Sequence, residues 1–370
     1  MQNLGDTVAR LKARPLVDLG SERPLDRSEI EGPNPGGLIA WKRVPEGLPS
    51  RPALVVALHG CTQTAAAYDV GSGWSTLAEQ YGFVVLYPEQ QRANNPGLCF
   101  NWYAPGDARR DAGEAASIRS AIESVMSQHD IDRSRVFITG LSAGGAMASV
   151  LLATYPEVFA GGAVIAGLPF GAASTVPEAF ERMRGQGLAA ASASTSAVLA
   201  ASTHPGPRPT ISIWHGTADH TVSPLNADAL VAQWGGVLGC AVQPDESTRI
   251  GRHTHRVWRD QTGSAILEDY RMAGMGHGVP IHTKGSDPCG RAGPYMIETE
   301  ISSTRALATR WKLDVANPAK QSPHETRSAQ PETTQTPPPS RVQNLPSEPA
   351  AVSHVQQVIE DALRRAGLMS

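Results

Sequence analysis

The 370-residue sequence lacks any run approaching the roughly 20 apolar residues that a membrane-spanning helix needs, so we expect no transmembrane segment. It also lacks a strong excess of charge. A formal net charge of −3 gives no bulk electrostatic reason to expect nucleic acid or an anionic membrane as a partner. Residues 1–15 lack the apolar stretch of a secretory signal. Three alternatives remain: the sequence is a mature form, the protein is exported by another route, or it is cytoplasmic.

Cysteine is scarce, and its spacing contains no C-x-x-C pair, so we expect no zinc site. Four cysteines allow three complete pairings. They fit two disulfides in an oxidising compartment, and they equally fit reduced thiols buried as small apolar groups. The four are Cys61, Cys99, Cys240 and Cys289.

From residue 53 the pattern alternates between short apolar runs and helical segments. The runs suit strands buried on both faces, and strands separated by helices predict an α/β fold with a mostly parallel central sheet flanked by helices. Between two of the runs, apolar residues recur at helical spacing from Ile118 to Met126. The expected strands are in 53–60, 83–89, 135–140, 162–167, 210–216, 255–260 and 265–274, with a closing helix over 293–313.

Composition divides the chain further. Residues 1–35 are polar and rich in turn formers, which predicts an N-terminal arm before a catalytic domain over 36–313. Residues 168–209, rich in alanine, serine, glycine and proline, predict a small cap of one or two helices beside the active site. Residues 314–351 are typical of a disordered linker, and 352–368 of a short amphipathic helix.

The chemistry concentrates where strands are expected to end. Residues 140–144 read G-x-S-x-G, between an apolar run and a helical segment, which is the context of a strand-to-helix turn that exposes a nucleophilic serine, Ser142. A hydroxyl needs a base, and the base needs an orienting acid. Asp219 follows an expected strand, and His277 lies between glycines after a later one. The order Ser, Asp, His is that of α/β-hydrolases, which predicts this fold and this triad.

Other acids and histidines compete for these roles. Asp228 and Asp245 do not directly follow a strand, and His215 is expected to pack beside the site. A glycine-rich loop after a strand is missing around His253, His255 and His282, which are therefore expected to be exposed or structural.

Residues 58–63 follow the first expected strand, from which hydrolases draw an oxyanion-hole donor. We assign that hole to the backbone N–H groups of Cys61 and Ala143, and no metal or organic cofactor is required. His59 and Gln63 beside it are candidate substrate-binding residues.

Six motifs carry a resemblance to a known family: HGCTQ at 59–63, CFNWY at 99–103, GLSAGGAM at 140–147, GLPFGAA at 167–173, WHGTAD at 214–219 and MGHG at 275–278. In this order they resemble the poly(3-hydroxybutyrate) depolymerase family of esterases, of the short-chain polyhydroxyalkanoate type, over about residues 35–313.

The resemblance implies a secreted serine esterase that cleaves a polyester or related feruloyl and acetyl-xylan esters, with Ser142, Asp219 and His277 as its triad. It also implies disulfides Cys61–Cys99 and Cys240–Cys289. The sequence leaves open a broad short-acyl esterase, lipase or peptidase chemistry on the same scaffold, and a non-catalytic binding protein.

The sequence also departs from the family. Phe100 and Val279 stand where members often carry tryptophan, so Trp102 and Trp74 become the candidates for an aromatic pocket wall.

Overall fold

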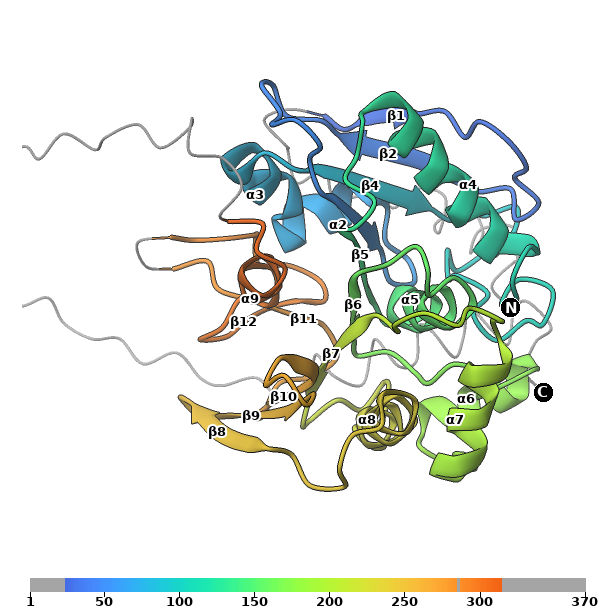
Figure 1. Cartoon of the computed structure of the whole chain (residues 1–370), viewed down its shortest axis with the longest axis vertical. Helices are drawn as coiled ribbons and strands as arrows, with labels where there is room; N and C mark the ends of the chain where they lie inside the picture. The colour runs from blue at the N-terminus through green and yellow to red at the C-terminus, as the bar shows by residue number, and fades with distance from the viewer. Residues whose placement is uncertain (1–23, 285–286, 315–370) are drawn as a thin grey trace, which may run out of the picture.

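A single large sheet organises the molecule (Figure 1). The computed structural model describes residues 24–284 and 287–314. Within them, ten strands form a sheet in the order β1-β2-β4-β3-β5-β6-β7-β10-β9-β8, parallel from β4 to β10 and antiparallel at both edges. The strands are β1 Asp26–Ser28, β2 Ile39–Arg43, β3 Leu54–Leu58, β4 Val84–Glu89, β5 Val136–Leu141, β6 Gly161–Ile165, β7 Thr210–Gly216, β8 Glu246–Ile250, β9 His253–Arg259 and β10 Ala265–Met272.

Helices cover both faces of the sheet, and each face has its own apolar core. Helices α4, α5 and α8 pack on one face, and α2, α3 and α9 lie on the other (Figure 1). A parallel two-stranded sheet, β11 and β12, lies beside α9. The bounds are α2 Ala65–Ser72, α3 Trp74–Tyr81, α4 Gly113–Gln128, α5 Ala143–Thr154, α6 Val176–Met183, α7 Ala191–Ala200, α8 Leu225–Leu238, α9 Ser303–Arg310, β11 Val279–Ile281 and β12 Met296–Glu298.

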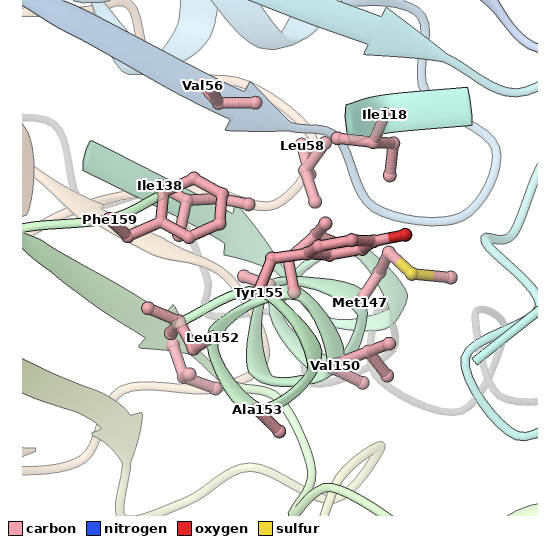
Figure 2. Close-up of a cluster of buried hydrophobic side chains, with 14 of the residues drawn as sticks. Val56, Leu58, Ile118, Ile138, Met147, Val150, Leu152, Ala153, Tyr155 and Phe159 are labelled. Carbon is pink, nitrogen blue, oxygen red and sulfur yellow. The ribbon is translucent and has the colours of Figure 1, made fainter. Parts of the chain in front are cut away.

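Helix α5 is the most deeply placed helix, and all of its residues are buried. It packs beside α4 and against the central strands, where Met147 and Val150 lie in one cluster with Leu58 of β3 and Ile138 of β5 (Figure 2). Burying a large aliphatic side chain stabilises a fold by about 1.5–3 kcal/mol. The centre of the sheet is therefore a rigid support for whatever stands at the start of α5.

The structure corrects two expectations about the ends of the domain. Strand β1 at Asp26–Ser28 pairs with β2, so the last part of the expected arm belongs to the sheet. The expected closing helix over 293–313 is wrong in its first half, because Met296–Glu298 pairs with Val279–Ile281 and the helix occupies only Ser303–Arg310. The expected linker, the terminal helix and most of the arm lie outside the described residues.

Two helices, α6 and α7, occupy the segment 168–209 that the sequence predicts as a cap. The Thr195 hydroxyl of α7 donates to the Gln233 carbonyl of α8 at 3.2 Å, which fixes the cap to the domain. None of the helices in the described ranges is long and apolar enough to cross a membrane.

Only one of the two implied disulfides is present in the described residues. Cys61 and Cys99 are bonded, whereas Cys240 and Cys289 are free thiols, so the expected Cys240–Cys289 bridge is wrong. The physical reason is their position. Cys240 packs against the core on the α8 face of the sheet, and Cys289 is buried in the core on the opposite face.

Candidate active site

Ser142 stands at the turn between β5 and α5 with φ 56° and ψ −118°, a backbone conformation that few non-glycine residues adopt. The two flanking glycines make the turn possible. A Cβ on Gly140 would lie 2.4 Å from Gly144, and one on Gly144 would lie 2.4 Å from the His59 carbonyl oxygen. The β3, β5 and α5 backbones therefore approach as closely as only glycine permits, and the turn presents Ser142 at the carboxyl edge of the sheet.

Asp219 follows β7 and is buried, with its side chain fully enclosed. Its Oδ1 accepts the N–H groups of Thr221 and Val222, both at 2.9 Å, and its Oδ2 lies 2.7 Å from His277 Nδ1. His215 Nε2 lies 3.3 Å from the same Oδ2. Burial alone would raise the pKa of Asp219, but the charge of His277 and the hydrogen bonds from His215 and His277 outweigh it and hold the pKa below its usual range.

The loop that carries His277 packs directly on the loop that carries Asp219. A Cβ on Gly216 would lie 2.2 Å from the Met275 carbonyl oxygen, and the Ala218 N–H donates to that oxygen at 3.0 Å. The imidazole is 8% exposed, with Nδ1 facing Asp219. A carboxylate at Nδ1 holds the proton there and leaves Nε2 as the basic nitrogen.

Ser142 and His277 line one apolar pocket, together with Cys61 and Ala143. The N–H groups of Cys61 and Ala143 donate to no backbone carbonyl of the described residues, so both remain available to an oxygen in the pocket. This is the arrangement that an oxyanion hole requires. The other lining residues are Gly60, Gln63, Asn95, Cys99, Trp102, Tyr103, Leu141, Leu168, Val176, Ala179, Phe180, Met183, Thr221, Val222 and Tyr295.

Of the candidate substrate-binding residues, Gln63 and Trp102 line this pocket and His59 does not. His59 is buried at the start of the oxyanion loop, which we define as residues 59–63. Its Nε2 accepts the Gln90 N–H at 3.1 Å, so its Nδ1 carries the proton and donates to the Gly60 carbonyl at 2.8 Å. Burial lowers the pKa of His59 to about 4. The substrate-binding assignment of His59 is therefore wrong, and the neutral ring supports the loop instead.

This burial makes fold stability depend on pH. Between pH 6.5 and about 4 the unfolded chain takes up a proton at His59 that the folded chain refuses, so stability is complete above pH 6.5 and falls with acidification. The expected loss is about 3 kcal/mol, at 1.36 kcal/mol per pKa unit. We predict that His59→Asn, which keeps a donor for Gly60, loses less stability on acidification. The free energy of unfolding, measured in urea at pH 7 and at pH 4.5, should differ less in the variant than in the unchanged protein. Equal losses in the variant and the unchanged protein would contradict this account.

A buried carboxyl supports the segment that carries the pocket residues Cys99 and Trp102. Glu114 on α4 accepts the backbone N–H and the Nδ2 of Asn101, both at 2.8 Å, and also the Gln90 Nε2. Gln90 Nε2 also donates to the Cys99 carbonyl at 3.1 Å. Burial raises the pKa of Glu114 to about 8, against these hydrogen bonds and with a further contribution from Asp107. The CFNWY motif therefore holds Trp102 in place by its polar contacts as well as by the Cys61–Cys99 bond.

The two residues that stand where the family often carries tryptophan, and the candidate Trp74, lie in the core. Phe100 is buried against the His59 ring, with centroids 4.9 Å apart, and Val279 is buried in β11. Trp74 stacks on Trp311 in the core, so its candidacy for the pocket wall is wrong.

The competing acids and histidines lie elsewhere. Asp228 forms an ion pair with Arg271 with its side chain 59% exposed, and Asp245 accepts the Arg259 N–H. His215 packs beside Asp219 as expected. The other three histidines contact residues outside the pocket. His253 accepts the Ala273 N–H, His255 stacks on Tyr270, and His282 contacts Glu298.

Within residues 24–284 and 287–314, no group of three or more His, Cys, Asp or Glu side chains is arranged to hold a metal ion. Tyr295 and the α6 residues of the pocket wall were not anticipated from the sequence. They carry no motif, and only the folded chain brings them to Ser142.

Known proteins resemble this chain in sequence and in fold. Residues 42–258 match the family model of the esterase PHB depolymerases. The poly(3-hydroxyalkanoate) depolymerase C of Paucimonas lemoignei is 46% identical over 275 residues, which are 74% of this chain and 66% of that protein. The acetylxylan esterase A of Aspergillus oryzae is 34% identical over 258 residues, 68% of this chain and 83% of that protein.

A solved structure, the acetyl xylan esterase from Aspergillus awamori, superposes with a TM-score of 0.64 at 30% identity, covering 69% of this chain and 94% of that one. This likeness confirms the predicted α/β-hydrolase fold.

Proposed function

Because this chain belongs to the esterase PHB depolymerase family, we propose that it is a serine carboxylic-ester hydrolase whose substrates are short-chain polyhydroxyalkanoates such as poly(3-hydroxybutyrate). The observation that carries the proposal is the His277–Asp219 pair, 2.7 Å apart, at the wall of an apolar pocket that also contains the strained Ser142. The polymer assignment follows the 46% identity to a poly(3-hydroxyalkanoate) depolymerase.

The reaction proceeds in two acyl-transfer steps. Ser142 attacks the ester carbonyl while His277 Nε2 takes its proton, and the same imidazole then protonates the departing alcohol. A water molecule activated by His277 releases the acid from the acyl-enzyme in the second step. Asp219 remains ionised throughout, as its lowered pKa favours, and stabilises the imidazolium that forms in each step.

The oxyanion that develops in both steps is bound by the N–H groups of Cys61 and Ala143. Ala143 is the first residue of α5, so the positive end of the helix dipole adds to its hydrogen bond. The Cys61–Cys99 bond and the neutral His59 hold the other donor in place before substrate arrives. Such preorganisation lowers the barrier because no donor has to turn when the charge forms.

The pocket suits an uncharged acyl group. No Asp, Glu, Lys or Arg side chain is among its lining residues, and α6 contributes the apolar side chains of Val176, Ala179, Phe180 and Met183. A carboxylate or ammonium group on the acyl chain would lose its hydration there without gaining a partner. Neutral ester-linked acyl units carry no charge to desolvate.

Acetylxylan ester hydrolysis is a second candidate, because acetylxylan esterases at 34% identity and at a TM-score of 0.64 share the scaffold. One assay separates the two. Ester bonds of a poly(3-hydroxybutyrate) suspension, followed by its clearing, should be hydrolysed faster per enzyme than the acetyl and feruloyl esters of xylan, followed by release of acetate and ferulate. Release of acids from xylan without clearing of the polymer suspension would favour the acetylxylan esterase function. If none of these esters is hydrolysed, the chain is a non-catalytic binding protein.

We place the enzyme outside the cell. The family resemblance supports this location, and so does the Cys61–Cys99 disulfide, because such bonds persist in oxidising compartments.

A further inference from the structure

We propose that His215 is a positioning residue for this reaction, which fixes the carboxylate of Asp219 and the turn that follows it. The inference rests on the proposed function and deepens it, because it gives a role to a second histidine beside the triad. Asp219 orients His277, so a group that sets where the carboxylate oxygens lie also sets the direction of the catalytic imidazole. His215 does not line the pocket, so its role is carried through Asp219.

His215 is a polar side chain in an apolar layer. It lies in β7, two residues after Ile213 and four after Ile211, so the three side chains point to the same face of the sheet. Both isoleucines belong to the apolar core on that face, and the His215 side chain is fully buried there. Burying a polar ring costs free energy unless the ring is hydrogen-bonded. The contacts of the two ring nitrogens therefore decide what the residue does.

One ring nitrogen faces two oxygens of the loop after β7. Nε2 lies 2.8 Å from the Val222 carbonyl oxygen and 3.3 Å from Oδ2 of Asp219. Both oxygens are acceptors, so Nε2 carries the proton, donates it to the Val222 carbonyl and places a positive hydrogen beside the carboxylate. Nδ1 has no hydrogen-bond partner within residues 24–284 and 287–314, so a proton on Nδ1 would be buried without an acceptor. The surroundings thus favour the tautomer with the proton on Nε2.

The hydrogen bond to Val222 closes the turn that holds Asp219. The N–H groups of Thr221 and Val222 donate to Oδ1 of Asp219, both at 2.9 Å. Val222 is therefore fixed at its N–H by Asp219 and at its carbonyl by His215. Without the ring the turn can shift, and Oδ2 with it, away from the 2.7 Å contact with His277 Nδ1.

Two substitutions at this position separate the hydrogen bond from packing. His215→Met fills a similar volume without a donor, and should lower kcat for p-nitrophenyl butyrate by a factor of about 10 to 100, because misplacing a catalytic group by about 1 Å costs up to about a hundredfold. His215→Gln carries an amide N–H at about the position of Nε2, and should restore kcat to within about threefold of the unchanged protein.

His255→Met is the matched control. It removes a largely buried imidazole from β9 of the same sheet, where the ring stacks on Tyr270 outside the pocket. The loss of packing is comparable, but no contact with the turn after Asp219 is lost. This variant should therefore leave kcat unchanged, whatever it does to the thermal unfolding curve.

A second readout needs no turnover. The proton on His277 Nδ1 lies in the hydrogen bond to Asp219, and its NMR resonance reports the length of that bond. The resonance should move upfield in His215→Met, because a longer hydrogen bond deshields the proton less. It should stay in place in His215→Gln and in His255→Met. A residue that only stabilises the fold would lower the unfolding temperature without moving this resonance.

Unchanged kcat or an unmoved His277 resonance in His215→Met would overturn the inference. So would a loss of kcat in His215→Gln or His255→Met as large as that in His215→Met. If His215→Met does not fold, His215→Asn takes its place with the same expected results, because its shorter amide does not reach Val222. If the unsubstituted protein does not hydrolyse the ester, the proposed function fails while the resonance still tests the role of His215, so the two failures are distinguishable.

Discussion

Ser142→Ala should abolish the hydrolysis of p-nitrophenyl butyrate, with kcat falling by a factor on the order of 10⁶. The reason is that the substitution removes the only atom that forms the acyl-enzyme in the proposed mechanism. The fold should persist, because alanine at φ 56° is no more strained than serine, and Gly140 and Gly144 still allow the turn. The measurement is steady-state kinetics beside a thermal unfolding curve.

Ser149→Ala supplies the control for this variant. Ser149 is a buried serine of α5, seven residues after Ser142, and does not line the pocket. Its replacement should leave kcat within about twofold. The Ser149 hydroxyl takes no part in the reaction, so the substitution changes only local packing. Substantial turnover by Ser142→Ala would contradict the assignment of the nucleophile.

Asp219→Asn is expected to lower kcat by a factor on the order of 10⁴. An asparagine keeps the size of the side chain and can still accept the N–H groups of Thr221 and Val222 through its oxygen. Its amide then donates toward His277 Nδ1, which forces the wrong tautomer and leaves Nε2 protonated. The same amide also faces the Nε2–H of His215, so two donors are brought together. That N–H donates to the Val222 carbonyl at 2.8 Å.

Asp228→Asn is the control for this second variant, because it removes a carboxylate from the same part of the sequence. Asp228 is exposed and pairs with Arg271, and exposed ion pairs contribute about 0–1 kcal/mol to stability. Kinetics of the two variants side by side should therefore show a large loss only for Asp219→Asn. A larger loss for Asp228→Asn would show that the acid has been misassigned.

The inner strands could be predicted from the sequence because they are buried on both faces and consist of continuous apolar runs, as in β3 and β5. The edge strands could not. All residues of β8 are exposed, and β1 consists of Asp26, Arg27 and Ser28, so neither carries an apolar signal. Their strand character comes from backbone pairing with a neighbour, which local composition does not encode.

The site divides in the same way. Ser142, Asp219 and His277 could be proposed because each stands in a local pattern of glycines and strand ends. The supporting residues could not be identified, since their roles depend on contacts between distant segments. The position of His59 predicts a pocket residue, and only its bonds to Gln90 and Gly60 show that it supports the loop. Tyr295 has no motif at all.

One measurement tests the triad most directly. A fluorophosphonate reacts with a serine hydroxyl only when a neighbouring base and an oxyanion site activate it, so we expect stoichiometric loss of activity with a single adduct. Peptide mass spectrometry should place that adduct on Ser142, and Asp219→Asn should react far more slowly. An adduct on another residue, or an unlabelled Ser142 in the folded protein, would contradict the account.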